Sequence, residues 1–345
     1  MHFKTRLAAG LALLLSCTSL QAEDTVNTQV TDSAKMTDSA EVLALKQEFI
    51  ATQVSKGFTE QEVQQFLSSA NHNQAVLDAI SKPWEAKPWH QYYPIFLTDK
   101  RLEKGLAFWQ ENAETIQKAA EKFQVDPQII VAIIGIETFY GGYMGNYKVQ
   151  DALYTLGFYY PPRATFFRSE FGNLMSLIKE EQLDNDNLKG SYAGAMGYGQ
   201  FIPSSYRHYS VDFSGDGRRD LLNSKEDAIG SVANYFHQHG WKKGAPVTLK
   251  LNHTSDTAPA ASVWVKGKPT QTVADILAPS LSLAESKDID ASQAALLIKL
   301  EQPEMNEYWL GLNNFYVITR YNRSPLYAMA VYQFSQQLEA AYHAK

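Results

Sequence analysis

Residues Val125–Gly142 read VDPQIIVAIIGIETFYGG, an apolar run that ends on a single glutamate. Asp126 suits the N-cap of a helix and Pro127 suits its first position, so the helix is expected to begin there. Apolar side chains between Ile129 and Ile136 cover nearly the whole circumference, which predicts a helix buried inside a core. The pair Gly141–Gly142 is expected to end it.

Glu137 shares a helix face with Ile133 and Ile134, which precede it by four and three residues. A carboxylate at that place loses hydration and lies at the negative end of the helix dipole, and both effects favour the neutral acid. A carboxyl group that stays protonated near neutral pH can act as a general acid. The alternative is a glutamate that reaches solvent or pairs with an arginine, and the helix alone does not separate the two.

The composition is that of a soluble globular protein. The chain has 345 residues, of which 45% are hydrophobic and 20% charged, and a net charge of −6. This length has room for two or three domains and a large core. A nucleic-acid binder would show a basic stripe, so the acidic balance predicts no nucleic-acid partner. The many aromatic rings suit sugar stacking, but most of them are expected to fill cores.

The N-terminus has the pattern of a signal peptide. Lys4 and Arg6 precede the apolar run Leu7–Leu15, which is too short for a permanent membrane anchor. Cleavage after Ala22 would release a soluble protein, whereas a lipoprotein-like box would attach a lipid to Cys17; the sequence slightly favours release. Cys17 is the only cysteine, so the mature fold is expected to lack disulfides, cysteine-ligated metals and thiol nucleophiles.

Hydrophobic periodicity predicts a mainly α protein, α+β overall, that leaves a helical body for a small β module and returns to it. The predicted divisions are a signal peptide over 1–22, a disordered polar leader over 23–40, an N-terminal helical domain over 41–124, a catalytic core over 125–243, a β-rich domain over 244–312 and a C-terminal segment over 313–345 that rejoins the core.

Local patterns add more detailed expectations. Thr59 and Glu62 fit a capping box. The stretch from about Thr98 to Phe123 reads as one long helix, and the tail Phe315–Ala344 also reads as helix. Three segments alternate as strands do: VTLKLN, ASVWVKG over 261–267, and AALLIKLE.

The segment Gly190–Tyr206, GSYAGAMGYGQFIPSSY, is rich in glycine and alanine, which lets the backbone approach a bulky ligand. Ser191 adds a hydroxyl and Gln200 an amide, and in a sugar cleft these groups would hydrogen-bond hydroxyl and acetamido groups. The alternative is tight helix packing by small residues.

The segment Asp212–Asp227, DFSGDGRRDLLNSKED, has the spacing of a calcium loop, with side-chain oxygens at alternate positions and Gly217 at the sixth. Asn223 stands where a glutamate is usual, so Asp227 or Glu226 would close a longer variant of the loop. A plain acidic turn is the alternative. Because no second such loop occurs, a structural ion is expected rather than a calcium sensor.

Together with Asn314–Tyr327, NFYVITRYNRSPLY, these stretches resemble the lytic murein transglycosylase B family from about Glu41 to the end. The resemblance implies a lysozyme-like helical core with an extra helical domain and a small β domain. It also implies cleavage of the β-1,4 bond between N-acetylmuramic acid and N-acetylglucosamine in peptidoglycan, with a 1,6-anhydro product. The matching segments are GIETFYGG, the YPPRATFF region, GSYAGAMGYGQFIPSSY, VDFSGDGRRDLL, DAIGSVANYFHQHGW and NFYVITRYNRSPLYAMAVYQ.

The resemblance also implies the site residues. These are Glu137 as the single catalytic acid/base; Ser191, Gln200, Tyr235, Tyr321, Asn322 and Tyr327 around the sugar; and Asp212, Ser214, Asp216, Arg218 through its carbonyl, and Asp227 around one structural calcium. Catalysis itself would need no cofactor. Many relatives read ETRWG where this chain has Phe139–Tyr140 after its ET, and the YPPR segment has fewer arginines than some, so contacts beside the acid and to the peptide stem are expected to differ.

A single acid suffices if the substrate supplies its own nucleophile, whereas ordinary glycosidases need two carboxylates. Asp151 and Glu170 are the nearest downstream carboxylates, and neither has a comparably apolar sequence context. The rival functions are a hydrolytic muramidase and a non-catalytic peptidoglycan-binding protein. The expected place is the periplasm of a Gram-negative bacterium, soluble or attached to the outer membrane, as a monomer that binds glycan strands and other cell-wall enzymes.

Overall fold

The computed structural model describes most of the chain after the leader. The predicted signal peptide, Cys17 and nearly all of the predicted leader lie outside the described residues. Those residues are 38–82, 87–253, 259, 261–277 and 280–344. Among them no helix combines the length and the apolar character needed to cross a bilayer.

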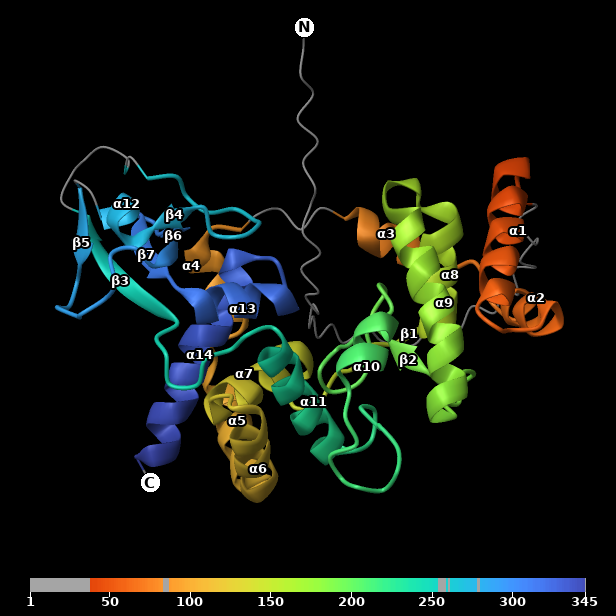
Figure 1. Ribbon diagram of the computed structural model, residues 1–345, viewed down its shortest axis with the longest axis horizontal. Helices are drawn as coiled ribbons and strands as arrows, with labels where there is room; N and C mark the ends of the chain where they lie inside the picture. Colours follow the sequence, from red (N-terminus) through yellow and green to blue (C-terminus); the bar gives the residue numbers. More distant parts are fainter. Residues whose placement is uncertain (1–37, 83–86, 254–258, 260, 278–279, 345) are drawn as a thin grey trace, which may run out of the picture.

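The first helices pack against a later pair. Figure 1 shows α1 and α2 beside α8 and α9 on the right-hand side. Phe49 of α1 packs its ring 5.2 Å from that of Phe171 in α9. The capping box of Thr59 and Glu62 is confirmed at the start of α2. The elements of this group are α1 (Ala40–Ser55), α2 (Glu60–Ser68), α3 (Gln74–Ser81), α8 (Val149–Tyr159) and α9 (Ala164–Glu181).

The single long helix expected up to Phe123 is wrong, because the chain forms α5 (Asp99–Glu111) and α6 (Ala113–Phe123) with a break at Asn112. The Asn112 side-chain amide donates to the carbonyl oxygen of Phe108 at 2.8 Å. Asparagine competes for backbone hydrogen bonds in this way, which makes it a poor residue for a helix interior.

The predicted buried helix is confirmed as α7 (Pro127–Thr138), which packs against α5, α6, α11 (Lys225–Gln238) and α14 (Pro325–His343). Every residue from Ile129 to its last residue is buried. Burying each isoleucine contributes roughly 1.5–3 kcal/mol, so α7 anchors the core of the molecule.

Asp126 occupies the N-cap position of α7, but its side chain does not cap the helix. Its carboxylate instead accepts hydrogen bonds from the indole of Trp241 at 2.8 Å and from the backbone N–H of Gly244 at 3.1 Å. The residue therefore ties the start of α7 to the chain that enters the β module.

The β module is a five-stranded antiparallel sheet in the order β4-β6-β7-β3-β5, at the left of Figure 1. The strand expected over 261–267 is wrong: Val263 forms only an isolated bridge to Leu297, and the chain turns away at Gly267, whose φ is +92°. The elements of the module are β3 (Thr248–His253), β4 (Gln271–Thr272), α12 (Val273–Leu277), β5 (Leu281–Leu283), β6 (Ala294–Leu300) and β7 (Glu307–Gly311).

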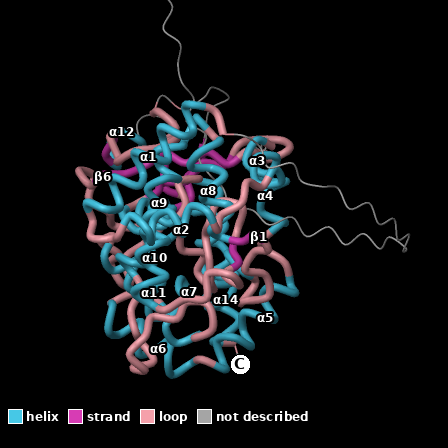
Figure 2. Tube along the Cα trace, turned by 90° about the vertical axis from the view of Figure 1, so that its right-hand side faces the viewer, coloured by secondary structure: helices cyan, strands magenta, loops and turns pink. Residues whose placement is uncertain are grey.

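After the module the chain returns to the core as α13 (Asn313–Tyr321) and α14, so the helical tail is confirmed, with a break at 322–324. In the side view the strands of the module gather at one end, and β1 stands apart from them (Figure 2). The mainly α fold with a β insert is confirmed; the predicted domain limits stay predictions. The remaining elements are α4 (Trp89–Tyr92), η1 (Tyr93–Ile95), β1 (Tyr147–Lys148), η2 (Pro161–Arg163), β2 (Lys189–Gly190) and α10 (Pro203–Tyr209).

Candidate active site

The C-terminal end of α7 is held by an unusual turn. The expected stop at Gly141–Gly142 is wrong, because the helix already ends at Thr138. Phe139 and Tyr140 follow with φ values of +53° and +60°. This left-handed conformation costs a non-glycine residue roughly 1–2 kcal/mol, so the surrounding packing must hold the turn in place.

Tyr140 supplies that packing. Its side chain is buried and lies over Gly105 of α5 and Gly135 of α7, where a Cβ atom on either glycine would collide with the phenol. Its ring lies 5.1 Å from that of Phe108. The turn thus inserts an aromatic ring between α7 and α5, and this burial offsets the backbone strain.

Phe139 makes different contacts from those of the buried tyrosine after it. Its ring lies 5.2 Å from the guanidinium carbon of Arg101 and 4.9 Å from the ammonium nitrogen of Lys104. These are cation–π contacts, worth roughly 0.5–1 kcal/mol each when exposed. Phe139 therefore has positive charge beside it, supplied by α5.

Glu137 is the second-to-last residue of α7 and is 7% exposed. Its Oε1 accepts a hydrogen bond from the Tyr327 hydroxyl at 2.5 Å. Burial raises the pKa of this carboxyl group to about 8, although the hydrogen bond from Tyr327 opposes the shift. The predicted neutral acid is confirmed in direction, and the alternatives of a solvent-exposed or arginine-paired glutamate are not what the structure shows.

Three phenols surround the acid: Tyr92, Tyr321 and Tyr327 are all at least mostly buried. Burial raises the pKa of each, and the nearby Glu137 raises it further, so the phenols stay protonated. Sequence reasoning missed Tyr92, which comes from α4. Its only signal was the aromatic connection around it, which resembles a core segment.

The glycine-rich loop is fastened to the catalytic helix. The hydroxyl of Thr138 donates to the carbonyl of Tyr198 at 3.0 Å. Gln200 adopts a φ of +51°, and its Nε2 donates to the carbonyl of Met144 at 3.2 Å. The Oε1 of Gln200 is buried and accepts no hydrogen bond from the described residues. That oxygen is therefore a buried acceptor without a partner among the described residues.

Ser191 is buried, and its hydroxyl oxygen accepts the N–H groups of Ala193 at 3.3 Å and Ala195 at 3.1 Å. The oxygen thereby shapes its own loop. Its hydroxyl hydrogen has no acceptor in the recorded hydrogen bonds of the described residues, so it remains able to donate to a ligand.

The residues predicted to line the sugar cleft also make hydrogen bonds within the protein. The hydroxyl of Tyr235 donates to the carbonyl of Arg320, and that of Tyr321 donates to the carbonyl of Gly199, both at 2.6 Å. The two rings lie 4.7 Å apart. Because both hydroxyl hydrogens are already donated, these tyrosines offer ring faces and lone pairs rather than donors. Asn322 is buried, and its Oδ1 accepts the N–H of Ser324 at 3.1 Å.

The expectation that Glu170 lacks an apolar setting is wrong, because its side chain is only 3% exposed and burial raises its pKa. The sequence hid this, since the contacts come from other segments. Its Oε2 accepts the N–H of Ser204 at 2.9 Å, at the start of α10. Within the described part of the chain, no recorded interaction joins it to Glu137. Asp151 is partly exposed and accepts the N–H of Asn71 at 2.9 Å.

The loop of residues 212–227 brings three carboxylates together. One oxygen from each of Asp212, Asp216 and Asp227 lies within 4.8 Å of the others. Gly217, at the sixth position, has a φ of +90°, as the predicted sharp turn requires. Asp227 belongs to this cluster and the exposed Glu226 does not, so the loop closes through the longer variant.

Asp227 is fully buried and accepts three backbone N–H groups, those of Phe213, Ser214 and Asp220, each at 2.8 Å. The Ser214 hydroxyl donates to Asp212 at 3.3 Å, and the Arg218 guanidinium donates to the carbonyl of Glu181 at 3.0 Å. The donor set of carboxylate and hydroxyl oxygens suits a hard cation such as calcium.

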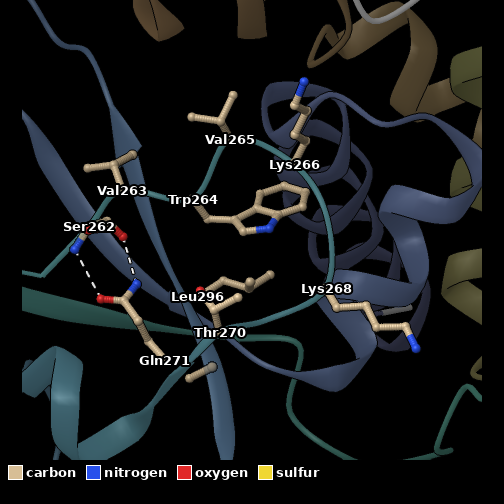
Figure 3. A pocket seen from close by; sticks show the side chains of 10 residues that line it. Ser262, Val263, Trp264, Val265, Lys266, Lys268, Thr270, Gln271 and Leu296 are labelled. Atoms are coloured by element: carbon tan, nitrogen blue, oxygen red, sulfur yellow. Dashed lines mark hydrogen bonds between the residues drawn. The ribbon is translucent and has the colours of Figure 1, made fainter. Parts of the chain in front are cut away.

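A separate hollow of about 180 Å³ lies in the β module, around the indole of Trp264 (Figure 3). Ser262 and Gln271 close one side through two reciprocal hydrogen bonds, of 3.0 and 2.7 Å. Lys266 and Lys268 lie at its rim, and none of the residues that line it is acidic. This hollow therefore offers no general acid.

Comparisons with known proteins identify the family of this chain. The family model described as the transglycosylase SLT domain matches residues 42–336. The membrane-bound lytic murein transglycosylase B of Escherichia coli (strain K12) is 41% identical over 306 residues, which cover 86% of this chain and 82% of that protein.

Two solved structures are similar over the same part of the chain. The soluble lytic transglycosylase SltB1 from Pseudomonas aeruginosa has a TM-score of 0.80 at 43% identity and covers 86% of this chain and 99% of its own. The Escherichia coli lytic transglycosylase Slt35 in complex with calcium has a TM-score of 0.77 at 41% identity, with 86% and 93% covered. The chain therefore belongs to the lytic transglycosylase family that the transglycosylase SLT domain defines, as its motifs predicted.

Proposed function

We propose that this chain cleaves the β-1,4 bond between N-acetylmuramic acid and N-acetylglucosamine in peptidoglycan, with Glu137 as the only acid/base. The observation that carries the proposal is the burial of Glu137, which raises the pKa of its carboxyl group to about 8; its recorded interactions in the described chain include no second carboxylate. A two-carboxylate glycosidase would place a second acid about 5–9 Å away.

In the first step the Glu137 carboxyl group donates its proton to the glycosidic oxygen, and the bond to the anomeric carbon breaks. The acetamido oxygen of the muramoyl sugar stabilises the positive charge that develops on that carbon. In the second step the Glu137 carboxylate accepts the proton of the muramoyl 6-hydroxyl, and that oxygen bonds to the anomeric carbon. The 1,6-anhydro ring closes without water, and the acid is restored.

The neighbouring groups support these steps. The hydrogen bond from Tyr327 holds the carboxyl group of Glu137 in one orientation. Ser191 and Asn322 would orient the sugar and its acetamido group, and the Oε1 of Gln200 would accept a sugar hydroxyl. Tyr235 and Tyr321 would contribute ring faces to the wall. The acid–base chemistry of one glutamate needs no cofactor.

The loop of residues 212–227 would hold one structural calcium through Asp212, Ser214, Asp216, the carbonyl of Arg218, and Asp227. The related Slt35 has been solved in complex with calcium. An ion bound only by the folded protein stabilises it, by about 2.7 kcal/mol at a hundredfold excess over its dissociation constant. Calcium should therefore raise the melting temperature of the parent protein but not that of Asp216→Asn, and an equal rise in both would contradict the assignment.

The chain would act in the periplasm of a Gram-negative bacterium on glycan strands, either released or attached through Cys17. Its relatives are named membrane-bound and soluble lytic transglycosylases. Mass analysis of the mature N-terminus decides between the two forms, because only the attached form would carry acyl chains.

Product analysis on purified sacculi tests the reaction. Parent protein should release anhydro-muropeptides, and Glu137→Gln should release none, because the amide keeps the shape and cannot give up a proton. Glu170→Gln is the matched control, because glutamine can still accept the N–H of Ser204. Products heavier by one water, or retained activity in Glu137→Gln, would contradict the proposal. Loss of activity in Glu170→Gln with hydrolytic parent products would favour a muramidase.

A further inference from the structure

Thr138 is the last residue of α7 and follows Glu137 directly in the chain. Its side chain is polar, yet it is only 1% exposed. The steps assigned to Glu137 do not use it. A buried hydroxyl group needs hydrogen-bond partners to offset the loss of its hydration, so its partners show which parts of the molecule it holds together.

The hydroxyl of Thr138 joins three segments. It donates to the carbonyl oxygen of Ile134, one turn earlier in α7, at 3.1 Å and to that of Tyr198 in the glycine-rich loop at 3.0 Å, so its single hydrogen is shared. Its oxygen also accepts the N–H of Gly141 at 3.0 Å. One atom therefore ties together the helix, the left-handed turn that follows it and the glycine-rich loop.

Tyr198, the partner in the loop, is held from other sides as well. Its N–H donates to the carbonyl of Leu221 at 3.0 Å, so both of its backbone polar groups are used. Its ring packs on Gly141, where a Cβ atom would collide with it. The loop is thus fixed at Tyr198, and Thr138 is the contact that relates this fixed point to α7.

This contact links two groups of the candidate active site. On one side Thr138 adjoins Glu137, and on the other Tyr198 lies two residues before Gln200, whose buried Oε1 has no partner among the described residues. Of the hydrogen bonds recorded for the described part of the chain, it is the one between α7 and the loop. Reacting groups must be held closely, because a displacement of about 1 Å can reduce a rate about a hundredfold.

We propose that Thr138 is a positioning residue, whose hydroxyl sets the place of Glu137 relative to the glycine-rich loop. The proposal rests on the proposed function, because it takes Glu137 as the acid and the loop as part of the sugar site. Without the hydroxyl the sugar would still meet the loop, but the proton would be given from a displaced carboxyl group. The loss should therefore appear in kcat rather than in KM.

The first test compares two variants on soluble peptidoglycan strands. Thr138→Val keeps the size of the side chain and removes the hydroxyl with all three of its contacts. Its kcat should fall about tenfold or more while KM changes less than about threefold, and Thr138→Ser, which keeps the hydroxyl, should stay within about threefold of the parent in kcat. A raised KM with unchanged kcat, or equal losses of kcat in both variants, would overturn the proposal.

The loss of a buried hydroxyl also destabilises the fold, so the test needs a matched control. Thr155 is fully buried, and its hydroxyl accepts the N–H of Asn73 at 2.9 Å. It belongs to α8, which stands apart from α7 in Figure 1. Thr155→Val should lower the urea midpoint about as much as Thr138→Val but leave kcat unchanged, and an equal loss of kcat would mean that stability alone is responsible.

A second pair of variants decides the question if Thr138→Val does not fold. Thr138→Ala and Thr138→Ser both lack the methyl group, so they differ only in the hydroxyl. The alanine variant should lose kcat and the serine variant should keep it. Equal kcat in the two would contradict a role of the hydroxyl in positioning Glu137.

A readout without turnover separates this inference from the proposed function. Burial is the main cause of the raised pKa of Glu137, and the titratable groups around it, Tyr92, Tyr321 and Tyr327, stay neutral. A displaced Glu137 meets more water, so the infrared midpoint of its protonated band should fall below pH 8 in Thr138→Val and return in Thr138→Ser. An unchanged midpoint would overturn the proposal. A parent protein that cleaves nothing would defeat the proposed function, whereas this midpoint would still decide on Thr138.

Discussion

The end of α7 and the loop of residues 212–227 both bury carboxyl groups, but they treat them in opposite ways. Glu137 accepts one hydrogen bond, from a phenol, and its pKa rises to about 8. Asp227 is equally buried and accepts three backbone N–H groups. Two buried carboxyl groups in this chain therefore differ in the number and kind of hydrogen-bond donors around them.

Asp212, in the same loop as Asp227, also accepts several backbone hydrogen bonds. Hydrogen bonds from the backbone, first from Gly217 and then from Gly215 and others, lower the pKa of its carboxyl group, although burial opposes them. The loop thus favours the anionic form of Asp212, which a cation would bind, whereas the helix end favours the neutral form of Glu137, which can give a proton. This difference is what separates a metal site from a general acid in this chain.

The largest effect should appear in the pH dependence of folding. The native Glu137 keeps its proton up to about pH 8, while an unfolded glutamate loses it near pH 4.5, so parent stability should fall across that window. Glu137→Gln removes this penalty. Its stability relative to the parent should rise by about 3–4 kcal/mol between pH 5 and 8, as measured by urea unfolding. Glu226→Gln, at an exposed position, is the control. If the free energies of unfolding of Glu137→Gln and of the parent changed in parallel with pH, Glu137 would not have a raised pKa.

The next effect concerns the anionic side of the comparison. Asp227→Ala removes a fully buried acceptor of three backbone N–H groups, and the free energy of unfolding should drop by about 3 kcal/mol or more. The neighbouring Glu226→Ala is exposed and should change it by less than about 0.5 kcal/mol. Equal values for the two variants would show that the hydrogen bonds to Asp227 contribute nothing.

The smallest effect tests the one donor that Glu137 has. Tyr327→Phe removes the hydrogen bond that lowers the pKa of the acid, so the basic limb of the rate profile should move upward by less than about one pH unit. The sign is the informative part. A shift to lower pH would mean that the phenol stabilises the neutral acid rather than the carboxylate.

Much of this was predictable from sequence. The core position of α7 followed from its all-round apolar pattern, and the approach of Asp212, Asp216 and Asp227 followed from the spacing of their oxygens. The left-handed turn at Phe139 and Tyr140 did not, because it depends on space over Gly105, which is distant in sequence. Periodicity gave no sign of it.

The role of Tyr92 and the burial of Glu170 were likewise hidden. Tyr92, whose pKa the charge of Glu137 raises, comes from α4, and the partner of Glu170 comes from the start of α10. Local sequence describes a residue's own helix face and not the segment that covers it. The break at Asn112 could have been predicted, since an asparagine side chain competes for backbone hydrogen bonds inside a helix.

The proposed mechanism depends above all on Glu137 being a neutral acid at physiological pH. Difference infrared spectroscopy between the parent and Glu137→Gln, followed across pH, measures this carboxyl group directly. We expect the band of the protonated acid to persist at pH 7 and to disappear with a midpoint near pH 8. A carboxylate band already complete at pH 5 would contradict this expectation, and Glu137 could not then be the general acid in the form described.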